Sequence, residues 1–238
     1  MDIKKETKKI RAALCENGTP TRAEKEKAYL KSPFEFYGVT VPFCDRLAKG
    51  VKKEHPDASR GEVFGLVREL WETQNHNEKT TGLKILSQYH SYLDMEAMPM
   101  LERMLMQSTG WDHVDGIATH LISEVLKKDK KACDYLRRWS ASDNFWMRRA
   151  SLISQILLFR KGGGDKKLFM GFARNMVSEK EFFIRKALGW TIRELSKHSP
   201  DDAFEMLAEL KSLGASGLTL REGAKRLPEK LRKKIAGR

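Results

Sequence analysis

The sequence predicts an all-α protein, built as a curved superhelix of repeated helical pairs. Three observations support this fold class: strand signals are nearly absent, apolar residues recur at helical spacing, and segments about 35 residues apart resemble one another. A strand would need sustained alternation of β-branched residues. The only short run of that kind is Val39-Thr40-Val41, and it ends at Pro42.

Amphipathic helices are indicated because apolar side chains three or four positions apart share one face of a helix. Three clear stretches are Val63, Leu66, Val67, Leu70 and Trp71; Leu83, Leu86, Tyr89, Tyr92 and Leu93; and Ile117, Leu121, Ile122, Val125 and Leu126. Residues typical of turns separate the helices at 55–57, 108–110, 140–143, 162–164, 199–201 and 213–215.

An internal repeat organises these helices. Residues 146–150 (WMRRA) match residues 183–187 (FIRKA), which lie 37 positions later, and Trp111 lies 35 positions before Trp146. Such a period is typical of a solenoid, in which each helical pair buries its apolar face only against its neighbours. We predict a single domain over residues 1–238, a solenoid of HEAT-like repeats with N-terminal capping helices at about 1–60 and a basic C-terminal cap at about 219–238.

Two local features are predicted to be structural. Ser142-Asp143 and Ser178-Glu179 precede helix starts, so we expect them to cap free backbone N–H groups. The run Gly162-Gly163-Gly164 follows a helix and lacks the ending of a phosphate-binding loop, so we expect a flexible connection.

Composition narrows the possible functions. No stretch approaches 18 consecutive apolar residues, and the N-terminus is charged where a secretory signal is apolar. We therefore expect a cytoplasmic protein that does not bind or cross a membrane. Cys15, Cys44 and Cys133 form no CxxC pair and are expected to be reduced thiols. The histidines lack the spacing of a helical metal site, so no metal is expected.

Positive charge points to a nucleic-acid partner. Lys and Arg number 45 against 32 Asp and Glu, and residues 219–238 alone hold eight basic and two acidic residues. A second basic cluster lies among aromatic residues, and Arg148, Arg149, Arg185 and Lys186 are its expected DNA-binding members. The alternative is that these are solvated helix faces or a site for an acidic protein.

Three aromatic helix starts together resemble the DNA alkylation repair family, the AlkD-type alkylpurine DNA glycosylases. They are residues 111–115 (WDHVD), 142–150 (SDNFWMRRA) and 180–190 (KEFFIRKALGW), the last followed by Arg193-Glu194. Residues 36–39 (FYGV) and 221–225 (REGAK) extend the similarity over about 29–225. The family's fold is a HEAT-like solenoid, in agreement with the repeat.

The resemblance implies hydrolysis of the N-glycosidic bond of positively charged N3- and N7-alkylated purines in duplex DNA, without strand cleavage, metal or cofactor and without flipping the base into a pocket. By motif, Asp115 matches the catalytic aspartate, Trp111 and Trp190 the tryptophans beside the deoxyribose, and Arg149 an arginine at the DNA backbone. Tyr29, Phe182 and Phe183 match further DNA-facing positions. The protein is expected to act as a monomer.

These assignments are chemically reasonable, because a carboxylate stabilises the sugar oxocarbenium ion electrostatically or orients the attacking water. Indole faces attract positive charge as well. Structural alternatives are a core position for either tryptophan, a helix-dipole role for Asp115, and an intrahelical ion pair of Arg149 with Asp143 or another acid. Trp71 and Trp139 are expected in the core. Asp112 is expected to point away from the face that Trp111 and Asp115 share.

The sequence departs from the family pattern at Thr40, where a polar amide is expected, and at Leu157, where a lysine is expected. Both positions concern DNA contacts rather than the bond that is broken. Two alternative functions remain: a non-catalytic protein that binds DNA structures, as in related subfamilies without the aspartate, and a scaffold for an acidic protein.

Overall fold

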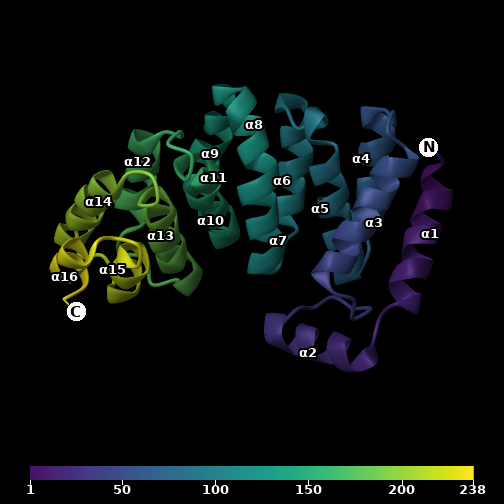
Figure 1. Ribbon diagram of the computed structural model, residues 1–238, viewed down its shortest axis with the longest axis horizontal. Coiled ribbons are helices and arrows are strands. Elements are labelled where there is room, and N and C mark those ends of the chain that lie inside the picture. Colours follow the sequence, from purple (N-terminus) through teal and green to yellow (C-terminus); the bar gives the residue numbers. More distant parts are fainter. Residues whose placement is uncertain (238) are drawn as a thin grey trace. The chain divides into compact units, whose positions relative to one another are not determined.

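The computed structural model describes residues 1–237, and this part of the chain is almost entirely helical (Figure 1). It contains no β-strand, only an isolated bridge between Glu35 and Asn75. The all-α class predicted from the sequence is confirmed. Among these residues, no helix has both the length and the apolar character that crossing a membrane requires. Arg238, a member of the expected basic cap, lies outside the described residues.

The chain forms two compact units. Unit 1 comprises residues 1–100 and 107–113, and unit 2 comprises 101–106 and 114–237 of the described chain. The helices of unit 1 are α1 (Ile3–Glu16), α2 (Pro20–Leu30), α3 (Val41–Glu54), α4 (Arg60–Trp71), α5 (His76–Gln88), and the 3₁₀ turns η1 (His90–Tyr92) and η2 (Met95–Ala97). Two helices belong in part to each unit: α6 (Met98–Met106) and α7 (Trp111–Gly116).

Unit 2 continues from α7 with a stretch of π-helix and then a series of α-helices. Its elements are η3 (Ile117–Ile122, the π stretch), α8 (Ser123–Lys128), η4 (Lys130–Ala132), α9 (Cys133–Ser140), α10 (Phe145–Ile153), α11 (Ile156–Phe159), α12 (Lys166–Met176), α13 (Phe182–Leu195), α14 (Pro200–Ser212), α15 (Gly217–Ala224) and α16 (Glu229–Ala236). Within this unit α10 packs on α13, and α13 packs on α15.

Helix starts recur along the chain with the period found in the sequence. Helices α5, α7, α10, α13 and α15 begin at residues 76, 111, 145, 182 and 217, which are 34 to 37 positions apart. A second series, α4, η2, η4, α12 and α14, begins at residues 60, 95, 130, 166 and 200. The aromatic segments therefore do open helices, and the repeat extends beyond the three segments that the sequence comparison identified.

Side chains join successive repeats at the same spacing. In unit 1 the Trp71 indole Nε1 donates a hydrogen bond of 2.7 Å to Gln107 Oε1. In unit 2 the Trp139 Nε1 donates one of 2.6 Å to Glu102 Oε1. Both tryptophans are buried, which confirms their predicted place in the core. Each indole thus combines apolar burial with a satisfied polar atom.

The serine caps predicted from the sequence are wrong. Helix α10 is capped by Asn144, whose side chain accepts from the Trp146 N–H, and α13 is capped by Glu181, which accepts from the Phe183 N–H. Ser142 Oγ instead accepts from the Asn144 N–H, in a turn before the helix. Asn and Glu side chains reach the free N–H groups from positions next to the first helical residue, so the serines lie too early in the chain.

The glycine run forms a connection between α11 and α12, as expected. Gly162 and Gly164 have φ values of +79° and +85°, a region that only glycine adopts without strain. Cys15, Cys44 and Cys133 are all free thiols, in agreement with the sequence prediction.

Helices α13 and α15 approach closely at Gly189. A Cβ atom at this position would lie 2.6 Å from the Glu222 Cβ and 2.7 Å from the Thr219 carbonyl oxygen. Because the second of these atoms is backbone, a larger residue would force the two helices apart. The contact matters for the site described below, since Trp190 follows directly in the chain.

Gly189→Ala should therefore destabilise unit 2, by about 1–3 kcal/mol from overpacking. Gly171→Ala in α12 is the matched control, because a Cβ there meets nothing within 4 Å and alanine favours the helix by up to about 1 kcal/mol. Thermal unfolding of the two variants checks this. A melting temperature for Gly189→Ala equal to or above that of Gly171→Ala would show that the close approach is not required.

Candidate functional site

An ion pair between Asp115 on α7 and Arg149 on α10 is the centre of the site in unit 2. Arg149 Nε donates to Asp115 Oδ1 and Nη2 donates to Oδ2, both at 2.7 Å, so the pair is bidentate. The Arg149 side chain is only 4 % exposed, whereas that of Asp115 is 16 % exposed. The guanidinium therefore fixes the direction of a carboxylate that solvent still reaches.

Aromatic groups of α13 surround the Arg149 guanidinium. Its carbon lies 5.8 Å from the ring centre of Phe183 and 5.8 Å from that of Trp190. Its third nitrogen, Nη1, donates a 2.7 Å hydrogen bond to the Phe183 carbonyl oxygen. Trp190 is half-buried. On α10, the Phe145 ring packs against Trp146, and the Trp146 ring packs against Phe183. The centre thus takes one helix, α7, α10 or α13, from each of three successive repeats.

The backbone next to Asp115 is unusual. α7 ends at Gly116 and passes into the π stretch η3, and the Thr119 hydroxyl donates 2.7 Å to the Asp115 carbonyl oxygen. Inserted π turns are rare and occur frequently at functional sites, because the extra residue redirects the side chains before it. Here the turn lies immediately after the carboxylate.

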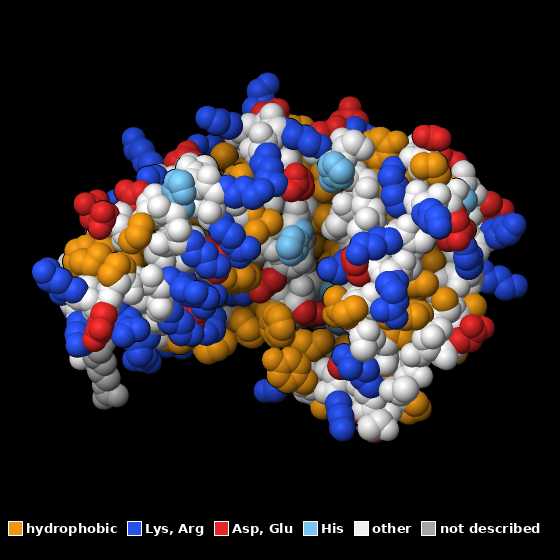
Figure 2. Space-filling view, in the orientation of Figure 1, with side chains coloured by type: hydrophobic (Ala, Val, Ile, Leu, Met, Phe, Trp, Pro, Cys, Tyr) orange, Lys and Arg blue, Asp and Glu red, His pale blue; other side chains and the backbone are white. Residues whose placement is uncertain are grey.

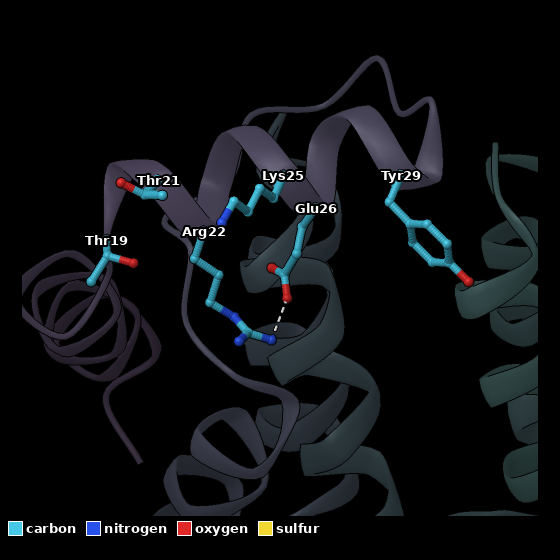
Figure 3. A pocket seen from close by; sticks show the side chains of 6 residues that line it. All are labelled: Thr19, Thr21, Arg22, Lys25, Glu26 and Tyr29. Carbon is cyan, nitrogen blue, oxygen red and sulfur yellow. Dashed lines mark hydrogen bonds and ion pairs between the residues drawn. The ribbon is translucent and has the colours of Figure 1, made fainter.

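Tyr29 and Trp111 form a second aromatic group, in unit 1. Tyr29 is 74 % exposed at the end of α2, and its ring meets that of Trp111 edge to face at 6.4 Å. Helix α2 has no buried residue, and its Arg22 and Glu26 side chains pair on the side that Figure 3 shows, beside a hollow of about 450 Å³. Trp111 is half-buried, so both rings are accessible.

The other expected DNA-binding residues are arranged differently. Arg148 is held by Glu179, to which it donates two hydrogen bonds of 2.9 Å, and by the carbonyl oxygens of Ser142 and Asp143. Phe182 is 48 % exposed next to Phe183. Arg185 is half-buried, and its Nε atom has no hydrogen-bond partner within residues 1–237.

Lys186 donates a 2.6 Å hydrogen bond to Glu222, which is buried on α15. Arg193 and Lys225 bind the same carboxylate, so three cations share one acid. Burial lowers the pKa of Lys186, and the nearby positive charges of Lys225, Arg193 and Arg149 lower it further. Positive charge is therefore in excess along the α13–α15 contact.

The structure brings Asp115, Arg149, Phe183 and Trp190 together in unit 2, and Tyr29 with Trp111 in unit 1. Trp111 and Asp115 share α7. A common DNA surface formed by both groups stays a prediction, and so do the individual roles in DNA binding and catalysis. The intrahelical ion pair suggested as an alternative for Arg149 is wrong: Arg149 pairs with Asp115, and the pair joins α10 to α7.

Sequence reasoning missed a cluster of His76, Asp112 and His113 in unit 1. The His76 and His113 rings stack at 4.3 Å, and Asp112 hydrogen-bonds His76 Nε2. Asp112 thus pairs with His76 within unit 1, whereas Asp115 pairs with Arg149 within unit 2. Burial is the largest single influence and raises the Asp112 pKa, but the His76 hydrogen bond and the charges of His113 and His76 together hold the pKa below its usual value. The 36-residue separation of His76 and Asp112, close to the repeat period, was the available signal.

This cluster fits a hydrogen-bond network better than a metal site. An ion lies in the plane of each ligating imidazole, about 2.0–2.1 Å from its nitrogen. The two rings are inclined by only 22°, so their planes do not meet at such an ion. A second candidate group, Glu6, Glu54 and His55, already holds the Lys9 ammonium at Glu54.

Comparison with known proteins identifies the family. A sequence profile described as DNA alkylation repair enzyme matches residues 10–227. The fold is that of a helical-repeat protein in which α7, α10 and α13 bring Asp115, Arg149 and Trp190 together, and the chain belongs to the DNA alkylation repair enzyme family. It therefore has a role in DNA repair. Among curated proteins, no sequence matches it.

Solved structures share the fold. One described as a predicted DNA alkylation repair enzyme from Enterococcus faecalis is 25 % identical with a TM-score of 0.79, over 90 % of this chain and 98 % of that one. AlkD2 from Streptococcus mutans is 17 % identical with a TM-score of 0.56, over 84 % and 90 % of the two chains. The protein smu.31 from Streptococcus mutans UA159 is 18 % identical with a TM-score of 0.56, over 79 % and 99 %. The last two similarities concern the fold alone.

Arg149→Gln should lower the free energy of unfolding by about 3–5 kcal/mol, because it leaves the Asp115 carboxylate without its buried partner. Asp115→Asn in the same chain should recover part of that loss, since it removes the unpaired charge. Urea unfolding of both variants measures the coupling. Arg174→Gln is the control, because its pair with Glu209 is exposed and its loss should matter much less. Equal costs at the two arginines would contradict this account of the pair.

The His113 environment predicts a pH-dependent stability. Burial lowers the pKa of His113 to about 3, against an ordinary value near 6.5 in the unfolded chain. Well above pH 6.5, His113 is neutral in both the folded and the unfolded chain, and the free energy of unfolding is not reduced by it. Below pH 6.5, His113 is protonated in the unfolded chain but stays neutral in the folded chain, which favours unfolding. Stability should fall by about 2 kcal/mol between pH 7 and pH 5 from this residue alone.

His113→Asn removes that titration, so the variant's loss between pH 7 and pH 5 should be smaller by about this amount, whatever its absolute stability. His198→Asn replaces an exposed histidine and is the control. Denaturant unfolding at the two pH values measures the difference. An unchanged loss in His113→Asn would contradict the assignment.

Proposed function

We propose that the protein is a DNA glycosylase that hydrolyses the N-glycosidic bond of positively charged N3- and N7-alkylated purines, such as 3-methyladenine and 7-methylguanine, in duplex DNA. The observation that supports this most is the solvent-reached carboxylate of Asp115, oriented by a guanidinium that lies 5.8 Å from the ring centre of Trp190. Family membership supports a repair enzyme, and the aromatic and cationic surroundings of the carboxylate favour a cationic substrate held on a phosphate backbone.

In the proposed hydrolysis, the main contribution of the protein is electrostatic stabilisation of the transition state. The alkylated base is already cationic and leaves as a neutral purine, so the unstable species is the sugar oxocarbenium ion. The Asp115 carboxylate stabilises that charge and orients the water that attacks the anomeric carbon. The water's proton passes to solvent or to the carboxylate, and the products are a free base and an abasic site. The faces of Trp111 and Trp190 attract the positively polarised sugar.

In this proposal Arg149 is a positioning residue. Its guanidinium lies under the carboxylate and is 4 % exposed, so it orients Asp115 rather than reaching a phosphate in this conformation. Phosphate contacts then come from exposed cations of the same unit, and Tyr29 and Phe182 offer exposed aromatic surface to sugar or base. Extrusion of the base is unnecessary if the sugar is approached from the backbone side.

The same ion pair favours a second candidate, a non-catalytic protein that binds DNA structures. A guanidinium next to Asp115 offsets the negative charge that would stabilise the oxocarbenium ion. In that case the basic surface would bind DNA while the pair served only to join α7 to α10.

Incubation with duplex DNA containing 7-methylguanine separates the two candidates. The wild type should release the free base and leave alkali-labile abasic sites, and Asp115→Asn should lower the single-turnover rate by about 100-fold or more. Trp190→Phe should show a smaller loss. The control Trp139→Phe changes an indole in the core. Base release that is undetectable, or equal in wild type and Asp115→Asn, would contradict the glycosylase proposal.

A further inference from the structure

We propose that a hollow between α15 and α16 binds backbone phosphates of the DNA, at a site separate from the Asp115–Arg149 centre. This inference rests on the proposed DNA substrate. The hollow measures about 440 Å³ and is lined by Arg221, Lys225, Arg232 and Ala236. Three of its four lining residues are cations, and they come from two consecutive helices of the last repeat.

The charge in the hollow is only partly compensated by described acidic residues. Arg221 and Arg232 are exposed and have no acidic partner among residues 1–237. Lys225 lies 2.8 Å from Glu222, but that carboxylate also binds Lys186 and Arg193. One acid among so many cations leaves a strong positive potential, which attracts a polyanion. When these cations neutralise DNA phosphates, the counterions condensed on the DNA are released, and this release favours binding.

The guanidinium of Arg221 is placed by the helix itself. Arg221 lies one turn after Gly217, and a Cβ at Gly217 would be 2.8 Å from Arg221 Nη1. The missing side chain leaves room for the guanidinium to lie along the first turn of α15. An arginine fork held in this way suits two oxygens of one phosphate, which a single ammonium does not match in geometry.

The lining favours a phosphodiester backbone over other anions. Among the four described lining residues only Ala236 is apolar, so the polar groups that the hollow offers to a ligand are those of three cations. Its volume lies within the range of about 300–1,000 Å³ of ligand sites, larger than one inorganic ion needs. Such contacts hold the duplex without reading its sequence, as a repair enzyme that meets lesions in any sequence requires.

The position in the fold connects the hollow to the catalytic candidates. α15 packs on α13, which carries Phe183, Lys186 and Trp190. In Figure 2, Lys and Arg side chains gather over the part of unit 2 in which Figure 1 labels α13 and α15. The hollow thus continues a basic surface of the same unit, and its phosphates would belong to the duplex that flanks the lesion.

Binding of a fluorescently labelled, undamaged duplex to the full chain between about 50 and 200 mM salt tests the proposal. Arg221→Gln/Arg232→Gln should make the negative slope of log K against log salt less steep by about 1–2, since each phosphate contact contributes about 0.9 to its magnitude. Arg226→Gln/Lys230→Gln is the matched control. It removes the same charge from exposed residues of the same cap that do not line the hollow, and should keep the wild-type slope.

The proposal would be overturned if the two double variants had the same salt slope, whether or not that slope differs from the wild type. Binding of poly-glutamate, an acidic polypeptide, is measured in the same way. If Arg221→Gln/Arg232→Gln lost poly-glutamate binding but still bound DNA like the wild type, the proposal would also be overturned. Melting curves show that each variant is folded. Release of 7-methylguanine is measured in parallel under single-turnover conditions with saturating enzyme. A wild type that releases no base defeats the glycosylase proposal and leaves the salt test valid, whereas normal release with an unchanged slope defeats only the hollow.

Discussion

A buried bidentate ion pair, Asp115 with Arg149, is the constraint on which unit 2 depends. It joins α7 to α10, and the third nitrogen of the same guanidinium reaches the backbone of α13. Desolvating a guanidinium is costly, so it is tolerated only because every face of it has a partner: two carboxylate oxygens, a carbonyl and two aromatic rings. The pair therefore sets both the spacing of three helices and the direction of one carboxylate.

The repeat explains how distant residues reach this centre. Each helical pair contacts the next, so side chains 34 to 37 positions apart in the chain become neighbours, as Trp139 and Glu102 do in unit 2. The same spacing relates Asp115 to Arg149 and Lys186 to Glu222. Polar contacts thus recur between successive repeats of unit 2 at this spacing. In the proposed function, the acid of this series that stays open to solvent is Asp115.

The helical fold and its period could be predicted because both depend on local spacing of apolar residues, and the aromatic starts at Trp111, Trp146 and Phe183 lie within one residue of real helix starts. Caps could not be assigned correctly, because Ser142 and Asn144 are both good capping residues and only backbone geometry distinguishes them. The partners of charged residues could not be predicted from the sequence either. Arg149 reads as an exposed cation in the sequence, and its burial follows from three-dimensional packing against Phe183 and Trp190.

The central claim is that the Asp115 carboxylate faces the sugar of a damaged nucleotide. A crystal structure with duplex DNA that carries a cationic azasugar, an analogue of the oxocarbenium transition state, tests it most directly. The account predicts the azasugar nitrogen within about 6 Å of the Asp115 carboxylate and against the Trp190 ring, with the Arg149 pair intact. DNA bound on another surface, with Asp115 remote from the analogue, would contradict it.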